Sequence, residues 1–195
     1  MEQIRFKVIG IEPLLLNNPR SVDPFDEYSK LKKVITSKRS KTDDDLLELR
    51  RLEVESKIYF DDKIGIYIPG RWLLAALAKN AFAQVKISKD KVRGSVFITE
   101  SKIPLKYAGQ KKVKKLTDIT NNNDFIITMI LPQKNVRLAK CAPVFNEWSF
   151  ETALEFDNSI IDERDLIKVL QYSSTYGGFG DFRPTYGRAA LEVLD

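Results

Sequence analysis

The 195-residue sequence contains no histidine. Without an imidazole, the Ser-His-Asp and Cys-His arrangements that activate a nucleophile cannot be assembled in their usual form. General acid–base chemistry near neutral pH would have to use carboxylates, lysines or tyrosines whose pKa values are shifted. This absence argues against an enzyme, and we expect a protein that catalyses no reaction itself.

Cysteine is almost as scarce, because Cys141 is the single one in the chain. No internal disulfide can form, which is typical of proteins from a reducing compartment. One cysteine without histidines also cannot supply the four nitrogen and sulfur ligands of a structural zinc site. The sequence therefore predicts no metal site and no cofactor.

Long apolar runs are absent too. The longest, WLLAALA and FIITMIL, fall well short of the roughly 20 residues that span a bilayer. The opening segment MEQIRFKVIG lacks the apolar region of a secretory signal. We therefore predict a cytoplasmic protein with no membrane partner.

The chain does contain enough apolar material for a core and a moderate excess of positive charge. Hydrophobic residues make up 43% of it, and 32 basic residues against 27 acidic ones give a net charge of +5. The length suits one well-packed domain over residues 1–195 better than two independent ones. The charge balance is compatible with a polyanionic partner.

Hydrophobic periodicity predicts the strands and helices. Alternation over residues 3–11 is typical of a half-buried strand, and the almost entirely apolar segment 71–85 is typical of a buried helix. The other expected strands cover residues 64–68, 95–99, 124–131, 146–156 and 189–194. The other expected helices cover residues 25–37 with Asp23 as N-cap, the stretch from Thr42 toward Tyr59, and residues 160–173 with a cap near Asp162.

The order of these elements mixes strand pairs with helices, which favours an α+β fold with an antiparallel sheet. A strand–helix–strand–strand–helix–strand core of ferredoxin-like or RNA-recognition-motif type fits this order, with the helices on one face of the sheet. The extra helices would form a basic insertion after the first strand, over about residues 20–62 of the single domain.

A glycine-rich segment near the C-terminus, YGGFGDFRPTYGR, carries the sharpest functional pattern. Its glycines allow a positive φ and a close approach to a ligand, and exposed amides there could hold phosphates. Aromatic rings and guanidinium groups could stack on unpaired bases. The alternative is a tight loop whose rings fill the core. The candidate side chains are Phe179, Phe182, Arg183, Tyr186 and Arg188.

Positive charge is clustered along the chain. Residues 30–41 contain six basic residues and no acidic one, and residues 102–115 contain six lysines and no acidic residue. Segregation of this kind suits a groove that follows a phosphate backbone, although each run alone could be an ordinary solvated face. The hypothesis requires that the runs converge in space with the glycine-rich loop. The candidate binding residues outside that loop are Arg20, Lys38, Arg39, Lys41, Arg71, Lys112, Lys114 and Arg137.

Two pairs of carboxylates offer an alternative, metal-dependent chemistry. Asp23 and Asp26 follow the first strand, and Asp61 and Asp62 end the second helix. Paired carboxylates can hold Mg²⁺. A helix cap at Asp23 and a turn at Asp61 and Asp62 account for the same residues without a metal, and we favour this second interpretation.

Two segments together resemble the RAMP superfamily, the repeat-associated proteins of CRISPR complexes. Residues 68–81, IPGRWLLAALAKNA, are similar to the family's proline-glycine helix start, with Arg71 and Trp72 where small residues are usual. Residues 176–189, YGGFGDFRPTYGRA, resemble its C-terminal glycine-rich loop. The resemblance implies a modified RNA-recognition fold, contact with single-stranded nucleic acid and side-by-side packing as an oligomer, in a compact stand-alone or virus-encoded relative.

These observations predict a module that binds single-stranded RNA or DNA without cleaving it, alone or as a subunit of a nucleoprotein complex. Two alternatives stay open. One is a metal-dependent endoribonuclease using Asp23, because some relatives of the resembled family use an aspartate in the loop after the first strand. The other is a viral adaptor or inhibitor that mimics a subunit of a host nucleoprotein complex.

Overall fold

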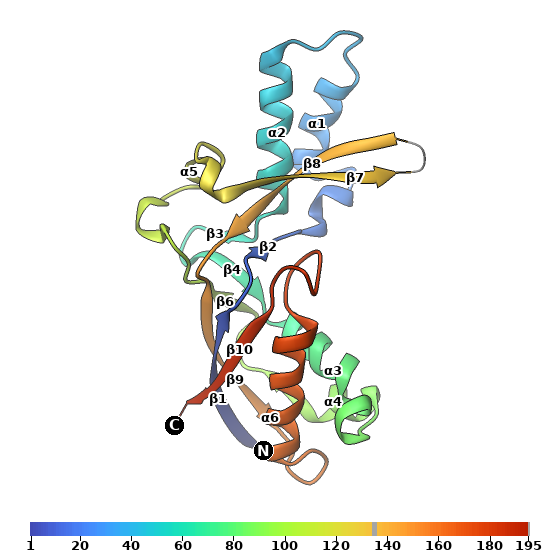
Figure 1. Ribbon diagram of the computed structural model, residues 1–195, viewed down its shortest axis with the longest axis vertical. Coiled ribbons are helices and arrows are strands. Elements are labelled where there is room, and N and C mark those ends of the chain that lie inside the picture. The colour runs from blue at the N-terminus through green and yellow to red at the C-terminus, as the bar shows by residue number, and fades with distance from the viewer. Residues whose placement is uncertain (134–135, 195) are drawn as a thin grey trace.

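The computed structural model describes residues 1–133 and 136–194, which fold as a mixed α+β protein with antiparallel sheets (Figure 1). The strands are β1 (Glu2–Gly10), β2 (Leu14–Leu15), β3 (Phe60–Asp61), β4 (Gly65–Pro69), β5 (Val96–Ile98), β6 (Lys102–Pro104), β7 (Ile126–Gln133), β8 (Val136–Phe145), β9 (Ser149–Phe156) and β10 (Ala189–Leu194). The helices are α1 (Glu27–Thr36), α2 (Asp43–Lys57), α3 (Arg71–Val85), α4 (Lys89–Ser95), α5 (Leu116–Thr120) and α6 (Glu163–Tyr172), with short turns η1 (Pro19–Val22), η2 (Gln110–Lys112), η3 (Asn123–Phe125) and η4 (Ser173–Gly177). Within these ranges, no helix combines the length and the apolar character that crossing a membrane requires.

The largest sheet has the strand order β10-β1-β9-β5, and each neighbouring pair is antiparallel. Along the chain, α3 lies between β1 and β5 and α6 lies between β9 and β10, and the two helices contact each other on one side of the sheet (Figure 1). On β1, the side chains of Ile4, Phe6 and Val8 are buried in the core, whereas Arg5 is exposed. The half-buried first strand that the alternation predicts is therefore confirmed.

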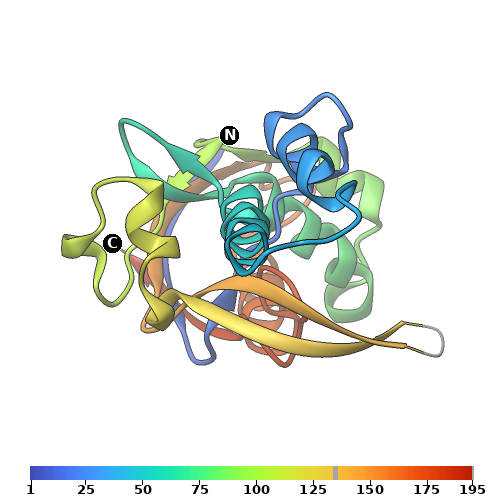
Figure 2. The same cartoon turned by 90° about the horizontal axis from the view of Figure 1, so that it is seen from above.

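The other half of the molecule is built from two hairpins. Helices α1 and α2 form one, which stands at one end of the molecule, and strands β7 and β8 form the other, which crosses beside it (Figures 1 and 2). Helix α2 packs on β8, and β2 pairs with β8 through Leu14 and Leu15. A small sheet of order β3-β4-β6 connects this half to the start of α3.

Local signals place several helix ends correctly. The Thr42 hydroxyl accepts a hydrogen bond from the Asp45 amide (3.2 Å), and the Asp45 carboxylate accepts one from the Thr42 amide (3.1 Å), so α2 begins with a capping box. Asp162 caps α6 by accepting from the Asp165 amide at 2.8 Å. The segment predicted as a buried helix is α3. Each cap satisfies an amide that has no partner inside its helix.

The first helix begins later than predicted. Its N-cap is Asp26, whose carboxylate accepts from the Tyr28 amide at 2.9 Å, while Asp23 accepts from the Phe25 amide in the preceding turn. Phe25 consequently lies outside the helix and is 80% exposed. Both aspartates satisfy backbone donors, and the one farther along the chain starts the helix, so the prediction of Asp23 as the cap was wrong.

The sequence prediction missed the strands β2, β3, β6 and β8 and the helices α4 and α5. The basic stretch after α3 forms the short helix α4, which begins at Ser88 because the serine hydroxyl accepts from the Lys91 amide. Cys141 lies inside the strand β8, and its backbone pairs with β7 at Thr128. The lysine at position 140 and the proline at 143 interrupt the apolar alternation of β8, which hid this strand.

Candidate nucleic-acid interface

The glycine-rich loop, residues 178–188, is held tightly against the strand β2. Gly178, Gly180 and Gly187 all have φ between +70° and +75°, a range that side-chain-bearing residues rarely adopt. A Cβ atom on Gly180 would lie 2.3 Å from the carbonyl oxygen of Leu15, and one on Gly187 would lie 1.8 Å from that of Phe179. These glycines are required by the close approach of one backbone segment to another.

The amides of this loop are already used. The Gly178 amide donates to the Ser173 carbonyl at 2.8 Å, and the Asp181 amide donates to the Leu15 carbonyl at 2.9 Å. The amides of Phe179 and Gly187 donate to the carbonyls of Gly187 and Pro13, both at 2.8 Å. The expectation that the glycine amides cradle phosphates is therefore wrong for these four donors, because each already has a backbone partner.

The rings and guanidinium groups of the loop divide into buried and exposed ones. Phe179 is 2% exposed and packs edge-on against Trp148 and Phe150, with ring centroids 6.3 and 5.7 Å apart. It fills the core, which corrects its predicted role in stacking on a base. The Arg188 Nε donates to the Thr175 carbonyl at 3.0 Å and thereby ties the loop to η4.

Three of the predicted loop residues keep accessible surface. Tyr186 is half-buried, Arg183 is exposed and is joined to Pro184 by a cis peptide bond, and Phe182 is 37% exposed with φ +53°. The carbonyl of Phe182 accepts from the Tyr186 amide at 3.2 Å, which closes the turn between them. Of these three, Phe182 and Arg183 line the cavities described next.

A cleft of about 450 Å³ lies where the two hairpins meet this loop. We call it the lysine cleft. Its walls come from α1, α2, β7, β8, the segment after β2 and the glycine-rich loop. The lining residues are Asn17, Lys32, Leu49, Glu53, Lys57, Met129, Lys140, Ala142, Asp181 and Phe182.

The three lysines of the cleft differ in how far their charge is already paired. The Lys57 Nζ donates to the Cys141 carbonyl and pairs with Glu53 at 2.8 Å. The Lys32 Nζ lies 3.4 Å from the Ser56 hydroxyl, and burial lowers the pKa of Lys32, an effect that Glu53 partly offsets. Lys140 is exposed and forms no ion pair with any residue that the structure describes. Lys32 and Lys140 are therefore the cations available to an arriving anion.

A smaller cavity of about 180 Å³ adjoins the lysine cleft and shares Asn17 and Asp181 with it. We call it the Trp72 cavity. The Asn17 side-chain amide donates to the Asp181 carboxylate at 2.8 Å, so these two residues form a fixed polar edge between the two spaces. The lining residues are Asn17, Trp72, Ala75, Phe179, Gly180, Asp181 and Arg183.

The end of the basic run, residues 38–41, does not reach the lysine cleft, although Lys32 of the same run lines it. Lys38, Arg39 and Lys41 lie in the turn between α1 and α2, at the far end of the helical hairpin (Figure 1). Lys38 is paired there with Asp45 at 2.6 Å. Arg20 pairs with Asp26 at 2.9 Å and lies over the Tyr28 ring. The expected convergence of Lys38, Arg39 and Lys41 with the glycine-rich loop is corrected, because much of α1 separates them from the cleft.

The remaining predicted cations lie elsewhere again. Lys112 and Lys114 precede α5, which flanks α2 on the side away from α1 (Figures 1 and 2). Arg137 is three residues from Lys140 on β8, so alternation places the two on opposite faces of the hairpin. Arg71 lines a separate cavity with Tyr59. Burial raises the pKa of Tyr59, and the nearby Arg71 guanidinium partly offsets this rise. Sequence clustering therefore did not predict clustering in space.

The lysines that do line the cleft were missed, although the sequence held a signal for them. Lys32 lies four residues after Tyr28 and three before the buried Ile35, which places it on the inner face of α1. Glu53 and Lys57 share one face of α2 by the same four-residue spacing. Helical periodicity applied to the charged residues, and not only to the apolar ones, indicates these positions.

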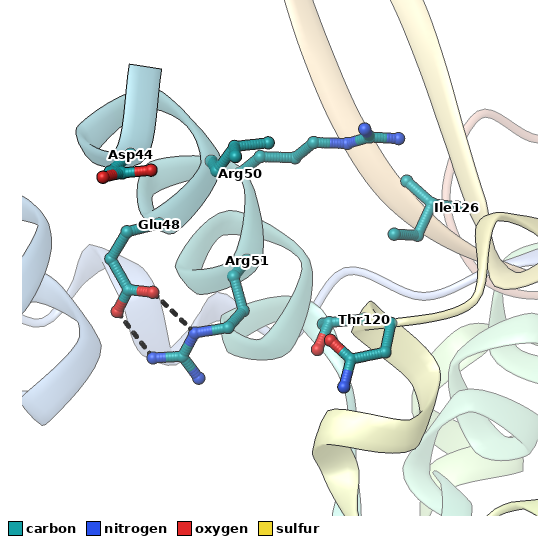
Figure 3. A pocket seen from close by; sticks show the side chains of 8 residues that line it. Asp44, Glu48, Arg50, Arg51, Thr120 and Ile126 are labelled. Carbon is teal, nitrogen blue, oxygen red and sulfur yellow. Dashed lines mark hydrogen bonds and ion pairs between the residues drawn. The ribbon is translucent and has the colours of Figure 1, made fainter. Parts of the chain in front are cut away.

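Helix α2 also lines a second cavity of about 340 Å³ on its α5 side, shown in Figure 3. Two Arg51–Glu48 hydrogen bonds of 2.6 and 2.8 Å cross its edge, and this bidentate pair lowers the pKa of Glu48. Arg51 also pairs with the buried Glu55 at 2.8 Å, and Thr120 donates to the same carboxylate at 3.2 Å. The Thr120–Glu55 bond connects α5 to α2, and the Arg51 guanidinium is held by Glu48 and Glu55 of its own helix.

Three of the four carboxylates considered for a metal form local bonds. Asp23 and Asp26 accept the backbone amides described above, and Asp61 accepts from the Lys63 amide at 2.9 Å and pairs with Lys102. Over residues 1–133 and 136–194, no three His, Cys, Asp or Glu side chains gather as a metal-binding group.

The face of the large sheet opposite α3 and α6, here called the open face, is a further surface to consider. Its charges alternate in sign, and Lys7 of β1 lies directly opposite Glu151 of β9. Glu151 also pairs with Lys106 at 3.0 Å. The aromatic side chain at the outward positions of these four strands is Phe97, 46% exposed. The open face thus offers the Lys106–Glu151 ion pair, cations that lie opposite carboxylates, and one ring.

Comparisons with known proteins add little to these observations. No family model matches the chain, and no curated protein matches it. Among solved structures, the chain is similar to Cmr6 from Pyrococcus furiosus, with 11% sequence identity, coverage of 98% of each chain and a TM-score of 0.36. At this identity and TM-score, the likeness establishes neither a common fold nor a common function.

Proposed function

We propose that the protein binds single-stranded nucleic acid in the lysine cleft and catalyses no reaction on it. The observation that carries this proposal is the placement of unpaired cations beside an exposed ring: Lys32 and Lys140 line the cleft together with Phe182. Arg183 lies in the adjoining cavity. Cations that follow a phosphate backbone and rings that receive unstacked bases are the general means of single-strand binding.

The burial of Lys32 supports this assignment. Burial lowers the pKa of its ammonium group because the charged form loses solvation. A phosphate arriving in the cleft restores a favourable partner for that charge. The exposed ring of Phe182 lies on the same cleft, and unpaired bases supply the flat surface that such a ring stacks on.

We also propose a ferredoxin-like or RNA-recognition-type core of the kind the RAMP resemblance implies. The order β10-β1-β9-β5, with α3 and α6 as the two crossovers, supports it, and α1 and α2 follow β1 as the expected insertion. The two segments that carry the resemblance also meet: residues 68–81 supply Trp72 and Ala75 to the Trp72 cavity, and residues 176–189 supply Phe179 and Arg183.

A salt titration tests the binding proposal. Labelled single-stranded RNA and DNA, and the matching duplexes, are titrated with protein at several salt concentrations and followed by fluorescence anisotropy. We expect both single strands to bind more tightly than the duplexes. If Lys32 and Lys140 each neutralise one phosphate, the slope of log affinity against log salt is about −1.4. Binding that ignores salt, or no binding to any strand, contradicts the proposal.

A matched pair of variants locates the site. Replacing Lys32 by glutamine removes one cation from the cleft and should reduce the salt slope by about 0.7. Lys91→Gln makes the same change on the exposed helix α4, away from the cleft, and should leave the slope unchanged. Equal changes in both variants contradict a site in the cleft.

The absence of catalysis needs its own measurement. Labelled RNA is incubated with the protein and Mg²⁺, with EDTA as the control, and analysed on a denaturing gel. We expect the RNA to stay intact in both. Cleavage that EDTA abolishes, and that Asp23→Ala also abolishes, supports instead the nuclease that the loop after the first strand suggested. Native mass spectrometry of the complex on a longer strand tests the predicted side-by-side packing.

A further inference from the structure

We propose that the Trp72 cavity receives one unpaired guanine base of the bound strand and selects it against the other bases. This inference rests on the proposed function, since it concerns a base of the strand whose phosphates pass the lysine cleft. It assigns a role to Asp181 and Trp72 that neither the charge pattern nor the glycine-rich motif indicates.

The walls of the cavity suit a flat aromatic ring. Trp72 is half-buried at the start of α3, with its other side fixed edge-on to Tyr59 at a centroid distance of 5.6 Å. Phe179 closes the cavity from the core side. Ala75 is exposed one turn after Trp72 on α3, and its small side chain leaves the space open. Aromatic and small side chains around a narrow space favour a planar ligand.

The polar edge of the cavity is a carboxylate whose position is fixed. Asp181 accepts from the Asn17 side chain through Oδ2 at 2.8 Å and from the Phe182 amide through Oδ1 at 3.0 Å. Its own amide is bonded to Leu15. A carboxylate has about four acceptor positions, so about two remain for a ligand. This acceptor is pre-oriented, and its backbone is anchored to β2.

The chemistry of the four bases decides which one this carboxylate accepts. Guanine presents two adjacent donors, N1–H and N2–H, which can bond both oxygens of a carboxylate. The corresponding edges of adenine, cytosine and uracil pair a single donor with ring or carbonyl acceptors, which the negative charge repels. Arg183 lines the same cavity and has no ion pair within the described residues, so its guanidinium is free to donate to the guanine O6.

The position of the cavity fits this role. It opens beside the lysine cleft and shares Asn17 and Asp181 with it. A strand whose phosphates contact Lys32 and Lys140 therefore passes the mouth of the cavity, and one splayed base can enter without the backbone leaving the cleft. Splayed bases read on their Watson–Crick edge are the usual means of sequence recognition in single strands.

The test uses oligouridine strands that carry a single central G, A or C, and the plain oligouridine, each as RNA and as the DNA counterpart. A single substitution avoids the self-association of guanine-rich strands. We expect the wild-type protein to bind the G-containing strand roughly tenfold more tightly than the other three. Asp181→Asn should remove this preference, because an asparagine offers a donor where the carboxylate offered an acceptor; loss of the Asp181 charge beside the lysine cleft should change the affinity for all four strands alike.

The outcomes separate the inference from the proposed function. Equal, salt-dependent binding of all four strands overturns the guanine pocket and leaves the lysine cleft standing. No binding to any strand overturns both. The wild-type comparison alone decides between these results if Asp181→Asn fails to fold. Ala75→Leu provides a second variant, since leucine suits a helix, fills the cavity and should abolish the preference for G; retention of that preference in Ala75→Leu overturns the proposed pocket.

Discussion

The lysine cleft and the open face of the large sheet both carry cations, and they differ in how those cations are paired. On the open face, Lys7 lies opposite Glu151, and Lys106 pairs with the same carboxylate at 3.0 Å. Lys106, followed by Lys7 and Arg5, holds the pKa of Glu151 below its ordinary value. In the cleft, Lys140 forms no ion pair with another described residue.

This difference shows why a count of charges does not locate a binding surface. The chain has a net charge of +5, which speaks to a polyanionic partner and not to a place on the fold. An exposed cation already bonded to a carboxylate must give up that bond to take a phosphate, whereas an unpaired one gives up only solvent. The cleft is the better candidate because Lys140 has no carboxylate partner among the described residues, whereas Lys7 of the open face lies opposite Glu151.

The largest predicted effect comes from a substitution that disrupts the glycine-rich loop, which forms one wall of the lysine cleft, and leaves the open face intact. In Gly187→Ala the new Cβ would lie 1.8 Å from the Phe179 carbonyl, at φ +75°. The strained φ and the overlap together should cost at least about 3 kcal/mol of unfolding free energy. Gly65→Ala is the matched control, because Gly65 has φ +78° and nothing within 4 Å of the new atom.

The control should lose only the conformational cost, roughly 1–2 kcal/mol. Urea unfolding monitored by circular dichroism measures both variants, and Gly187→Ala should also lose nucleic-acid binding while Gly65→Ala keeps it. Equal losses of stability in the two variants contradict the close packing of this loop.

The second-largest predicted effect is on single-strand affinity, and it compares two exposed phenylalanine rings. Phe182 lines the cleft and Phe97 projects from the open face. Stacking of one base on a ring is worth about 1–3 kcal/mol, so Phe182→Ala should weaken single-strand affinity roughly tenfold or more. Phe97→Ala should leave the affinity unchanged. Anisotropy titrations measure both, and a loss on Phe97→Ala alone moves the site to the sheet.

Signals confined to a few neighbouring residues could be predicted from the sequence. The bounds of α3 follow from its apolar run after Pro69-Gly70, and the caps at Thr42 and Asp162 follow from side chains that accept nearby amides. The α+β class follows from the order of elements. In each case the deciding interactions lie within one element, so periodicity and capping rules capture them.

The candidate site could not be predicted, because it brings together residues far apart in the chain. Lys32 and Lys140 meet only because α2 packs on β8. Phe179 and Phe182 are three residues apart in the same loop, yet the first fills the core and the second is exposed, since the loop is fixed by Leu15 and Pro13 of a distant segment. The amino-acid composition of the loop is the same whether Phe179 or Phe182 is buried, so composition does not show which ring is exposed.

A charge reversal compares the two surfaces directly. Lys140→Glu removes a cation of the cleft, and Lys7→Glu makes the same change on the open face. A charge-assisted hydrogen bond contributes about 1.5 kcal/mol, so Lys140→Glu should weaken single-strand binding roughly tenfold. Lys7→Glu should change it little. Titration of both at the same salt concentration decides, and a larger loss for Lys7→Glu reverses the comparison.

The smallest predicted effect is on stability, and it tests the ion pair between Lys106 and Glu151 on the open face. Lys106 holds the pKa of Glu151 below its ordinary value of 4.5, so the ionised carboxylate stabilises the fold above that pH, and the stabilisation is lost as the pH falls through the lowered pKa. Glu151→Gln should therefore lower the urea midpoint slightly at neutral pH and match the wild type once the pH falls below the lowered pKa of Glu151. Glu155→Gln is the control, because Glu155 lies opposite Gln3 on the same face and forms no ion pair with a described residue. The urea midpoint of Glu155→Gln should follow that of the wild type at every pH. Exposed ion pairs are weak and screened by salt, so the difference between Glu151→Gln and the wild type should also vanish in high salt. A difference that persists in acid or in salt shows that Glu151 acts through packing and not through its charge, and the contrast between paired and unpaired cations then loses its basis.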